Sequence, residues 1–320
     1  MRRVTIGSVL LFLVLPPTLA CGQFKEDETA TGGLGPSRVQ RWKAGFIVKA
    51  VSAPCRGIVG YMPVPAQWPE QTVRVAHEEI SPSVKLSYQT VDEYSKVMVV
   101  RIAILQANEE AKALVTFEIS RSAQLPPADT SLFSLPDAKT LAHGVRQYLA
   151  PSPEIESRNA KIRRLAKEIG VDKEKAWDKV EAIYDWARKK VEYKAGMPLK
   201  GAATALRDGS GGHEDLTGLF IALCRANDIP ARTVWVPEHC YAEFYLIDKK
   251  GAGHWFPCEA AGTRAFGEMP DTKLILQKGD NFRPPYNPKD HQRFMAERLT
   301  GAQAANGARP TITAVHELAN

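Results

Sequence analysis

Histidine and acidic residues that could perform chemistry lie between positions 213 and 259 of the chain. His213 follows a stretch with glycines at positions 196, 201, 209, 211 and 212, and His239 and Glu259 come further along. Imidazole and carboxylate groups exchange protons or bind metal ions near neutral pH, so these three residues are the first candidates for a functional site. Cys240 adjoins His239 and Cys258 adjoins Glu259, which adds two candidate nucleophiles.

Apolar spacing predicts the elements that carry these residues. A helix should begin at His213, because apolar residues recur after it at helical intervals, at positions 216, 219, 220, 223 and 224. Positions 233–236 have the composition of a buried strand, 239–246 alternate as a second strand, and a third begins at 254. We therefore expect His213 at a helix N-terminus and His239 at the start of a strand.

Three stretches carry a recognisable pattern: GGHEDLTGLFIALCRANDIPARTVWV, then HCYAEFYL and HWFPCE. Their order resembles the core of the transglutaminase-like superfamily, a group of papain-like thiol enzymes, and the resemblance covers positions 199–262. The family pattern is a glycine-rich loop, a cysteine at a helix N-terminus, an Ile-Pro-Ala-Arg motif, a histidine that opens one strand and an aspartate on the next. The resemblance implies an antiparallel sheet packed on a central helix.

The family's three catalytic positions map onto His213, His239 and Glu259, and the first and third depart from the pattern. In the family, the helix dipole favours a thiolate, the histidine holds the proton, and the carboxylate orients the imidazole. Glu259 supplies a longer carboxylate than aspartate. His213 has no thiol, so covalent thiol catalysis at this position is impossible. The resemblance therefore implies a catalytically degenerate domain that binds a peptide or protein partner.

Two alternatives stay open. The chain could be an active thiol amidase, protease or acyl transferase with a displaced nucleophile at Cys240 or Cys258. Because adjacent side chains of a strand point to opposite faces, however, Cys240 should point away from His239 and Cys258 away from Glu259. The site could instead bind a metal ion through His213 and His239, with Glu259 or His254 as the third ligand. No other cofactor is expected.

The first residues predict export. Arg2 and Arg3 precede an apolar run and a small residue before Cys21, so positions 1–20 read as a signal peptide. Cys21 is then either lipidated, which would give a membrane anchor, or close to a simple cleavage site in a secreted protein. We expect a periplasmic, cell-envelope or secreted protein with an envelope partner. Disulfide pairing remains open among the other cysteines, at positions 55, 224, 240 and 258.

Composition excludes some other classes of partner. The formal net charge is +6 and would be +4 without the two arginines of the signal segment. No Lys/Arg run dominates, so nucleic-acid binding has no support. The basic residues at 158–167 are typical of the solvated face of a helix.

The segments together predict an α+β protein. After the signal peptide we expect a flexible tether at 21–40, a β-sandwich at 41–124 and a connector with helices at 125–195. A transglutaminase-like domain should follow at 196–300, opening with a glycine-rich loop at 196–212, and a mobile tail at 301–320.

Overall fold

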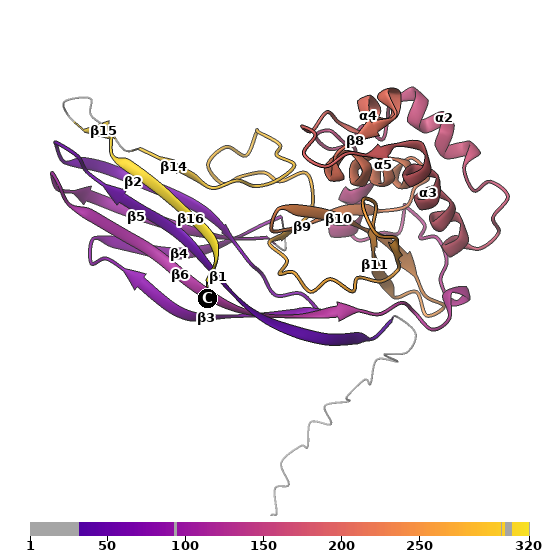
Figure 1. The fold of residues 1–320 in the computed structure, drawn as a ribbon, viewed down its shortest axis with the longest axis horizontal. Helices are drawn as coiled ribbons and strands as arrows, with labels where there is room; N and C mark the ends of the chain where they lie inside the picture. Colours follow the sequence, from indigo (N-terminus) through magenta and orange to yellow (C-terminus); the bar gives the residue numbers. More distant parts are fainter. Residues whose placement is uncertain (1–31, 93–94, 302, 305–308, 320) are drawn as a thin grey trace, which may run out of the picture.

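The computed structural model describes residues 32–92, 95–301, 303–304 and 309–319. These residues form a β-rich lobe and a second lobe in which helices pack on a sheet, which confirms the predicted α+β class (Figure 1). The predicted signal segment, Cys21 and most of the tether lie outside the described residues. Among the described helices, none is long and apolar enough to cross a bilayer.

Two antiparallel sheets make the β-rich lobe. The first has the strand order β16 (Thr311–Ala319), β1 (Leu34–Lys49), β6 (Glu110–Gln124) and β3 (Gln71–Ile80). The second has the order β14 (Arg298–Thr300), β2 (Cys55–Val64), β5 (Ser95–Leu105) and β4 (Val84–Val91), and β15 (Gln303–Ala304) also pairs with β2.

Side-chain alternation explains how these sheets pack. Along β6 the more buried and less buried residues alternate, because successive side chains of a strand point to opposite faces. Phe117 of β6 and Phe46 of β1 share one buried cluster with Met98 of β5. The cluster joins the two sheets face to face, as in a β-sandwich.

Two predicted boundaries of this lobe are wrong. β1 begins at Leu34 and pairs with β6 from the Leu34–Gln124 pair onward, so positions 34–40 are strand rather than tether. Positions 311–319, predicted as part of a mobile tail, form β16 and pair with β1 from Arg41 to Lys49. Most of β16 is exposed, so the segment lacks an apolar pattern, and only its pairing with β1 makes it a strand.

Helices form most of the second lobe. They are α1 (His143–Arg146), α2 (Ala160–Glu168), α3 (Ala176–Lys190), α4 (Ala202–Asp208) and α5 (His213–Arg225). The predicted loop at 196–212 is wrong in part, because it contains α4. The flanking glycines suggested a loop, but Gly209 instead ends this short helix in the left-handed conformation, at φ 71°. Ala202, Ala205 and Leu206 are buried against the rest of the lobe.

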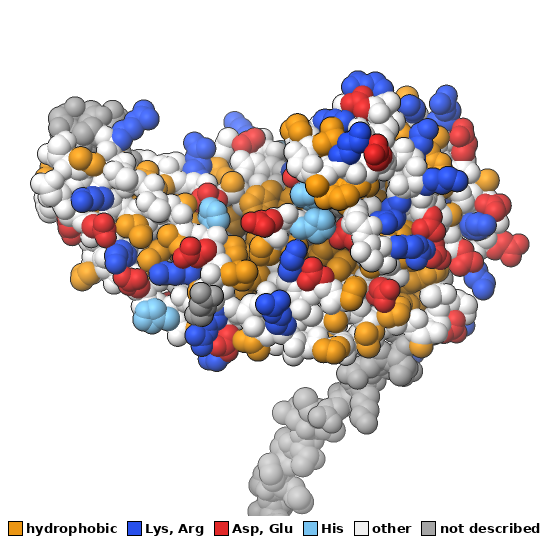
Figure 2. All heavy atoms as spheres, in the orientation of Figure 1, with side chains coloured by type: hydrophobic (Ala, Val, Ile, Leu, Met, Phe, Trp, Pro, Cys, Tyr) orange, Lys and Arg blue, Asp and Glu red, His pale blue; other side chains and the backbone are white. Residues whose placement is uncertain are grey.

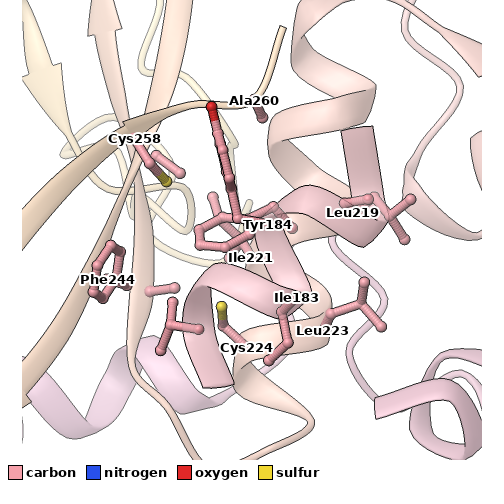
Figure 3. Packing of buried hydrophobic residues seen from close by; sticks show 14 of the residues in the cluster. Ile183, Tyr184, Leu219, Ile221, Leu223, Cys224, Phe244, Cys258 and Ala260 are labelled. Atoms are coloured by element: carbon pink, nitrogen blue, oxygen red, sulfur yellow. The ribbon is translucent and has the colours of Figure 1, made fainter. Parts of the chain in front are cut away.

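In the second lobe, β7 (Glu192–Tyr193) and β8 (Ser210–Gly211) form a short parallel pair. The larger sheet of this lobe lies beneath α5. Its strand order is β12 (Ala265–Phe266), β11 (Gly253–Glu259), β10 (His239–Ile247), β9 (Ala231–Val236) and β13 (Gln277–Lys278), and every neighbouring pair is antiparallel. Figure 3 shows side chains of α3 and α5, among them Tyr184 and Cys224, packed with Phe244 of β10 and Cys258 of β11. Every residue of α5 from Asp215 to Arg225 is buried. The helix is therefore the central element of this lobe.

Candidate functional site

The ends of three elements meet at one point of the second lobe. His213 is the first residue of α5, His239 the first of β10, and Glu259 the last of β11. His239 Nε2 lies 2.7 Å from Glu259 Oε2, and the ring centroids of His213 and His239 are 4.8 Å apart. The structure thus brings together the three residues that the sequence mapped onto the family's catalytic positions.

The carboxylate of Glu259 is held from two directions. Its Oε1 accepts a hydrogen bond from the backbone N–H of Ala261 at 2.8 Å, while Oε2 faces His239. The backbone carbonyl of Glu259 accepts from Tyr184 Oη at 2.7 Å and from Arg188 Nη1 at 3.0 Å. Helix α3 therefore anchors the end of β11, and the longer side chain of glutamate still reaches the imidazole.

The loop before His213 is organised by the carboxylate of Asp215, which is buried. It accepts hydrogen bonds from the backbone N–H groups of Gly212 at 3.1 Å, Lys200 at 3.0 Å and Gly201 at 2.9 Å. A Cβ atom at Gly211 would lie 2.7 Å from Cβ of Asp215, so no side chain fits there. These contacts determine how the chain enters α5 and where His213 lies.

The surroundings of His213 keep its imidazole neutral. Burial lowers its pKa from the ordinary histidine value, and the charges of His239 and Arg293 lower it further, while Glu214 and Glu259 act in the opposite direction. The positive end of the helix dipole also disfavours a cation at this position. At neutral pH, His213 therefore presents an uncharged ring beside His239.

Arg293 is a site residue that the sequence analysis missed. Its side chain is buried beside the first turns of α5, where Nη2 donates to the carbonyl of Glu214 at 2.8 Å and Nε lies 3.4 Å from Glu214 Oε2. It comes from the segment between β13 and β14, where no motif surrounds it. Only the folded chain brings this charge to the site.

The cysteines of the described residues are not placed as nucleophiles. Cys240 and Cys258 are fully buried, and all four described cysteines are free thiols. Burial raises the pKa of Cys240 to about 12 and that of Cys258 well above the ordinary thiol value. Neither forms a thiolate near neutral pH, which argues against the displaced-nucleophile alternative.

The metal-site alternative is also not supported by the geometry. The part of the chain that the structure describes holds no group of three or more His, Cys, Asp or Glu side chains that could bind a metal ion. The ring of His239 is already engaged by Glu259. His254, the other suggested ligand, lies at the opposite end of β11, where its Nε2 is 3.0 Å from Asp248 Oδ2.

Comparison with known proteins identifies the family of the segment that holds these three residues. Residues 163–260 match the family model described as the transglutaminase-like superfamily. This segment is a transglutaminase-like domain. The match confirms the resemblance read from the sequence, and it spans α3, α4, α5 and the strands that carry His239 and Glu259.

Solved structures give a likeness of fold. The chain is similar to a Cytophaga hutchinsonii protein described as a "Putative Cysteine Protease", with 18% identity, a TM-score of 0.53, and coverage of 87% of this chain and 92% of that chain. The periplasmic domain of TgpA from Pseudomonas aeruginosa matches at 12% identity and a TM-score of 0.37, over 72% of this chain and 88% of that one. No curated protein sequence matches the chain.

Proposed function

We propose that this chain is an exported, catalytically degenerate transglutaminase-like protein that binds a peptide or protein partner of the cell envelope at the His213–His239–Glu259 site. The observation that carries the proposal is the identity of His213. It occupies the helix N-terminus where the family places its thiol, beside a histidine and a carboxylate that are still in contact. A neutral imidazole there can accept or donate a hydrogen bond, but it cannot form the family's thioester.

Several groups at the site remain able to contact a peptide. The intrahelical hydrogen bonds of α5 start with Leu216 N–H to the carbonyl of Gly212, so the N–H groups of the partly exposed residues His213 and Glu214 are not used by the helix. The side chains of His239 and Glu259 are 23% and 15% exposed. These donors and acceptors suit the carbonyl and amide groups of an extended peptide.

Exposed apolar side chains border the same region. Tyr193 pairs in register with Gly211, two residues before His213, and Leu199 is also exposed on the segment that leads to α4. Phe294 is exposed next to Arg293 and packs on Trp235 with ring centroids 5.2 Å apart. On the face drawn in Figure 2, histidine and hydrophobic side chains lie together near the hollow between the lobes. Such surroundings favour a partner with apolar side chains.

The absence of thiol chemistry is tested by alkylation. The unmodified, reduced protein is treated with dilute iodoacetamide near pH 6, and labelled cysteines are mapped by mass spectrometry. Slow labelling at every cysteine is expected, since a thiol of ordinary or raised pKa is nearly inert there. Fast, selective labelling of Cys240 or Cys258 would show a relocated nucleophile and overturn the degenerate assignment.

Binding is tested with a pool of extended peptides, monitored by NMR of the imidazole signals. Peptides that bind should shift the signals of His213 and His239 and should be recovered unchanged. His239→Gln should abolish the shift at His213, whereas His254→Gln, the matched control at the far end of β11, should leave it intact. Cleaved or cross-linked peptide products would contradict the proposal.

A further inference from the structure

Helix α2 is amphipathic, and its solvent side is strongly basic. Asn159 caps the helix, with its Oδ1 accepting from the N–H of Lys161 at 3.0 Å. Ile162 and Ala166 are buried in the core of the second lobe, so the remaining arc of the helix faces water. That arc carries one acid, Glu168, and four bases: Lys161, Arg163, Arg164 and Lys167.

Most of these charges have no partner within the described chain. Arg164 lies 4.0 Å from Glu168, and both side chains are more than half exposed. Within the described residues, Lys161, Arg163 and Lys167 make no side-chain hydrogen bond or ion pair. The outer face of α3 is different, because Arg264 there contacts both Glu181 and Asp185. The basic excess of α2 is therefore not a general property of the helical lobe.

An exposed aliphatic residue follows this basic face. Val171 is 75% exposed, the largest value among the large hydrophobic residues that the structure describes. Gly170, in the left-handed region at φ 67°, turns the chain after the helix, and a Cβ atom there would lie 3.3 Å from Lys179. Val171 thus lies in a turn whose sequence neighbours are the bases Lys167, Lys173 and Lys175 and the acids Glu168, Asp172 and Glu174. Lys173 is paired with Asp172 at 2.9 Å, so the basic excess lies on α2 itself and Val171 follows it in the chain.

We propose that the outer face of α2 together with Val171, here called the α2 surface, docks on an anionic lipid bilayer. Basic side chains near such a bilayer gain electrostatic attraction, and a protruding aliphatic side chain gains free energy by leaving water. The proposal goes beyond the proposed function, because the α2 surface is separate from the site at His213 and does not require a peptide ligand.

Vesicle binding tests this docking surface. The full chain carrying Cys21→Ser, so that no lipid can be attached there, is sedimented with vesicles of phosphatidylcholine alone and with added phosphatidylglycerol. Binding should require phosphatidylglycerol and should weaken as salt is raised. Arg163→Gln with Lys167→Gln should weaken binding about thirty-fold, because each base near the surface raises the affinity roughly five-fold. Val171→Ser should weaken it about tenfold.

The matched control is Arg38→Gln with Arg56→Gln, which removes two exposed charges from the sandwich lobe and should change binding less than about twofold. Equal losses in the two double variants would mean that only net charge matters and would overturn the proposal. Equal binding to both kinds of vesicle would do so as well. Binding to a soluble polyanion without binding to vesicles would assign the α2 surface to another partner.

Discussion

At position 213 the environment that activates a thiol in this fold acts against an imidazole. Unpaired N–H groups and the helix dipole stabilise an anion such as a thiolate, and they destabilise a histidine cation. Burial, His239 and Arg293 lower the pKa of His213 in the same direction. The same helix N-terminus thus favours the thiolate form of a cysteine and the neutral form of His213.

The lowered pKa of His213 predicts a stability change with pH. Because the unfolded chain binds this proton more readily than the folded chain, the unfolding free energy should be highest above the ordinary histidine pKa of about 6.5. It should fall as the pH drops through the lower pKa of the folded state. Urea denaturation at a series of pH values measures this. His213→Gln should flatten the decline, while the exposed control His77→Gln should not.

Restoring the thiol should restore its reactivity. In His213→Cys, the thiol would lie at the N-terminus of α5 beside His239, so its pKa should be depressed and iodoacetamide should label it quickly at pH 6. Adding His239→Gln should slow that labelling by about tenfold or more. Arg38→Cys, at an exposed position of β1, provides the ordinary thiol for comparison. An equally slow thiol at both positions would show that the three site positions are assigned incorrectly.

Among the elements, α5 joins the buried core to the site, because His213 is its first residue and its residues from Asp215 to Arg225 are buried. Its core side is packed against β10 and α3, which prevents the helix from shifting. Its first turn is joined to the loop before it through Asp215. The position of His213 therefore depends on one buried carboxylate as well as on packing.

Removing that carboxylate should destabilise the loop and the helix end together. Asp215→Ala leaves three backbone N–H groups without their acceptor, and we expect a loss of about 3 kcal/mol in unfolding free energy. Urea denaturation followed by circular dichroism measures the loss. The control Asp208→Ala removes a solvent-exposed carboxylate and should leave the midpoint nearly unchanged. A similar small effect for Asp215→Ala would contradict the anchoring role.

Across the whole molecule, buried charges join the sandwich to the helical lobe. Lys278 of β13 contacts Glu70 of the sandwich lobe at 2.6 Å and also contacts Glu243 of β10, which in turn pairs with Arg232 at 2.7 Å. Burial alone would raise the pKa of Glu243, but Lys278 and Arg232 lower it to about 2. Gln71 adds hydrogen bonds to both the N–H and the carbonyl of Ile275. The lobes should therefore unfold together.

Breaking this network tests that coupling. Glu243→Ala leaves two buried cations without their shared partner, and we expect a loss of about 3–5 kcal/mol. The loss should appear in urea unfolding monitored by tryptophan fluorescence, with both lobes affected. Glu79→Ala removes the partner of Lys112 on the sandwich surface and should have little effect. Two separate transitions in the unmodified protein would contradict the idea of a single cooperative unit.

The local pattern of apolar residues in the sequence was sufficient to predict much of the fold and of the candidate site. Apolar periodicity placed the helix that starts at His213, and alternation placed the strand that starts at His239, because both depend on residues close together in the chain. The family resemblance then selected Glu259. Periodicity did not indicate α4, whose seven residues lie between glycines, nor β16, whose side chains are mostly exposed.

The sequence by itself determined that position 213 has no thiol and that His239 and Glu259 accompany it. Tertiary structure decided what those residues contact. The contact of Glu259 with His239, the buried charge of Arg293 beside α5 and the burial of Cys240 and Cys258 all depend on elements that are distant in the chain. Long-range packing sets distances, exposure and pKa, and none of these follows from the order of residues in a segment.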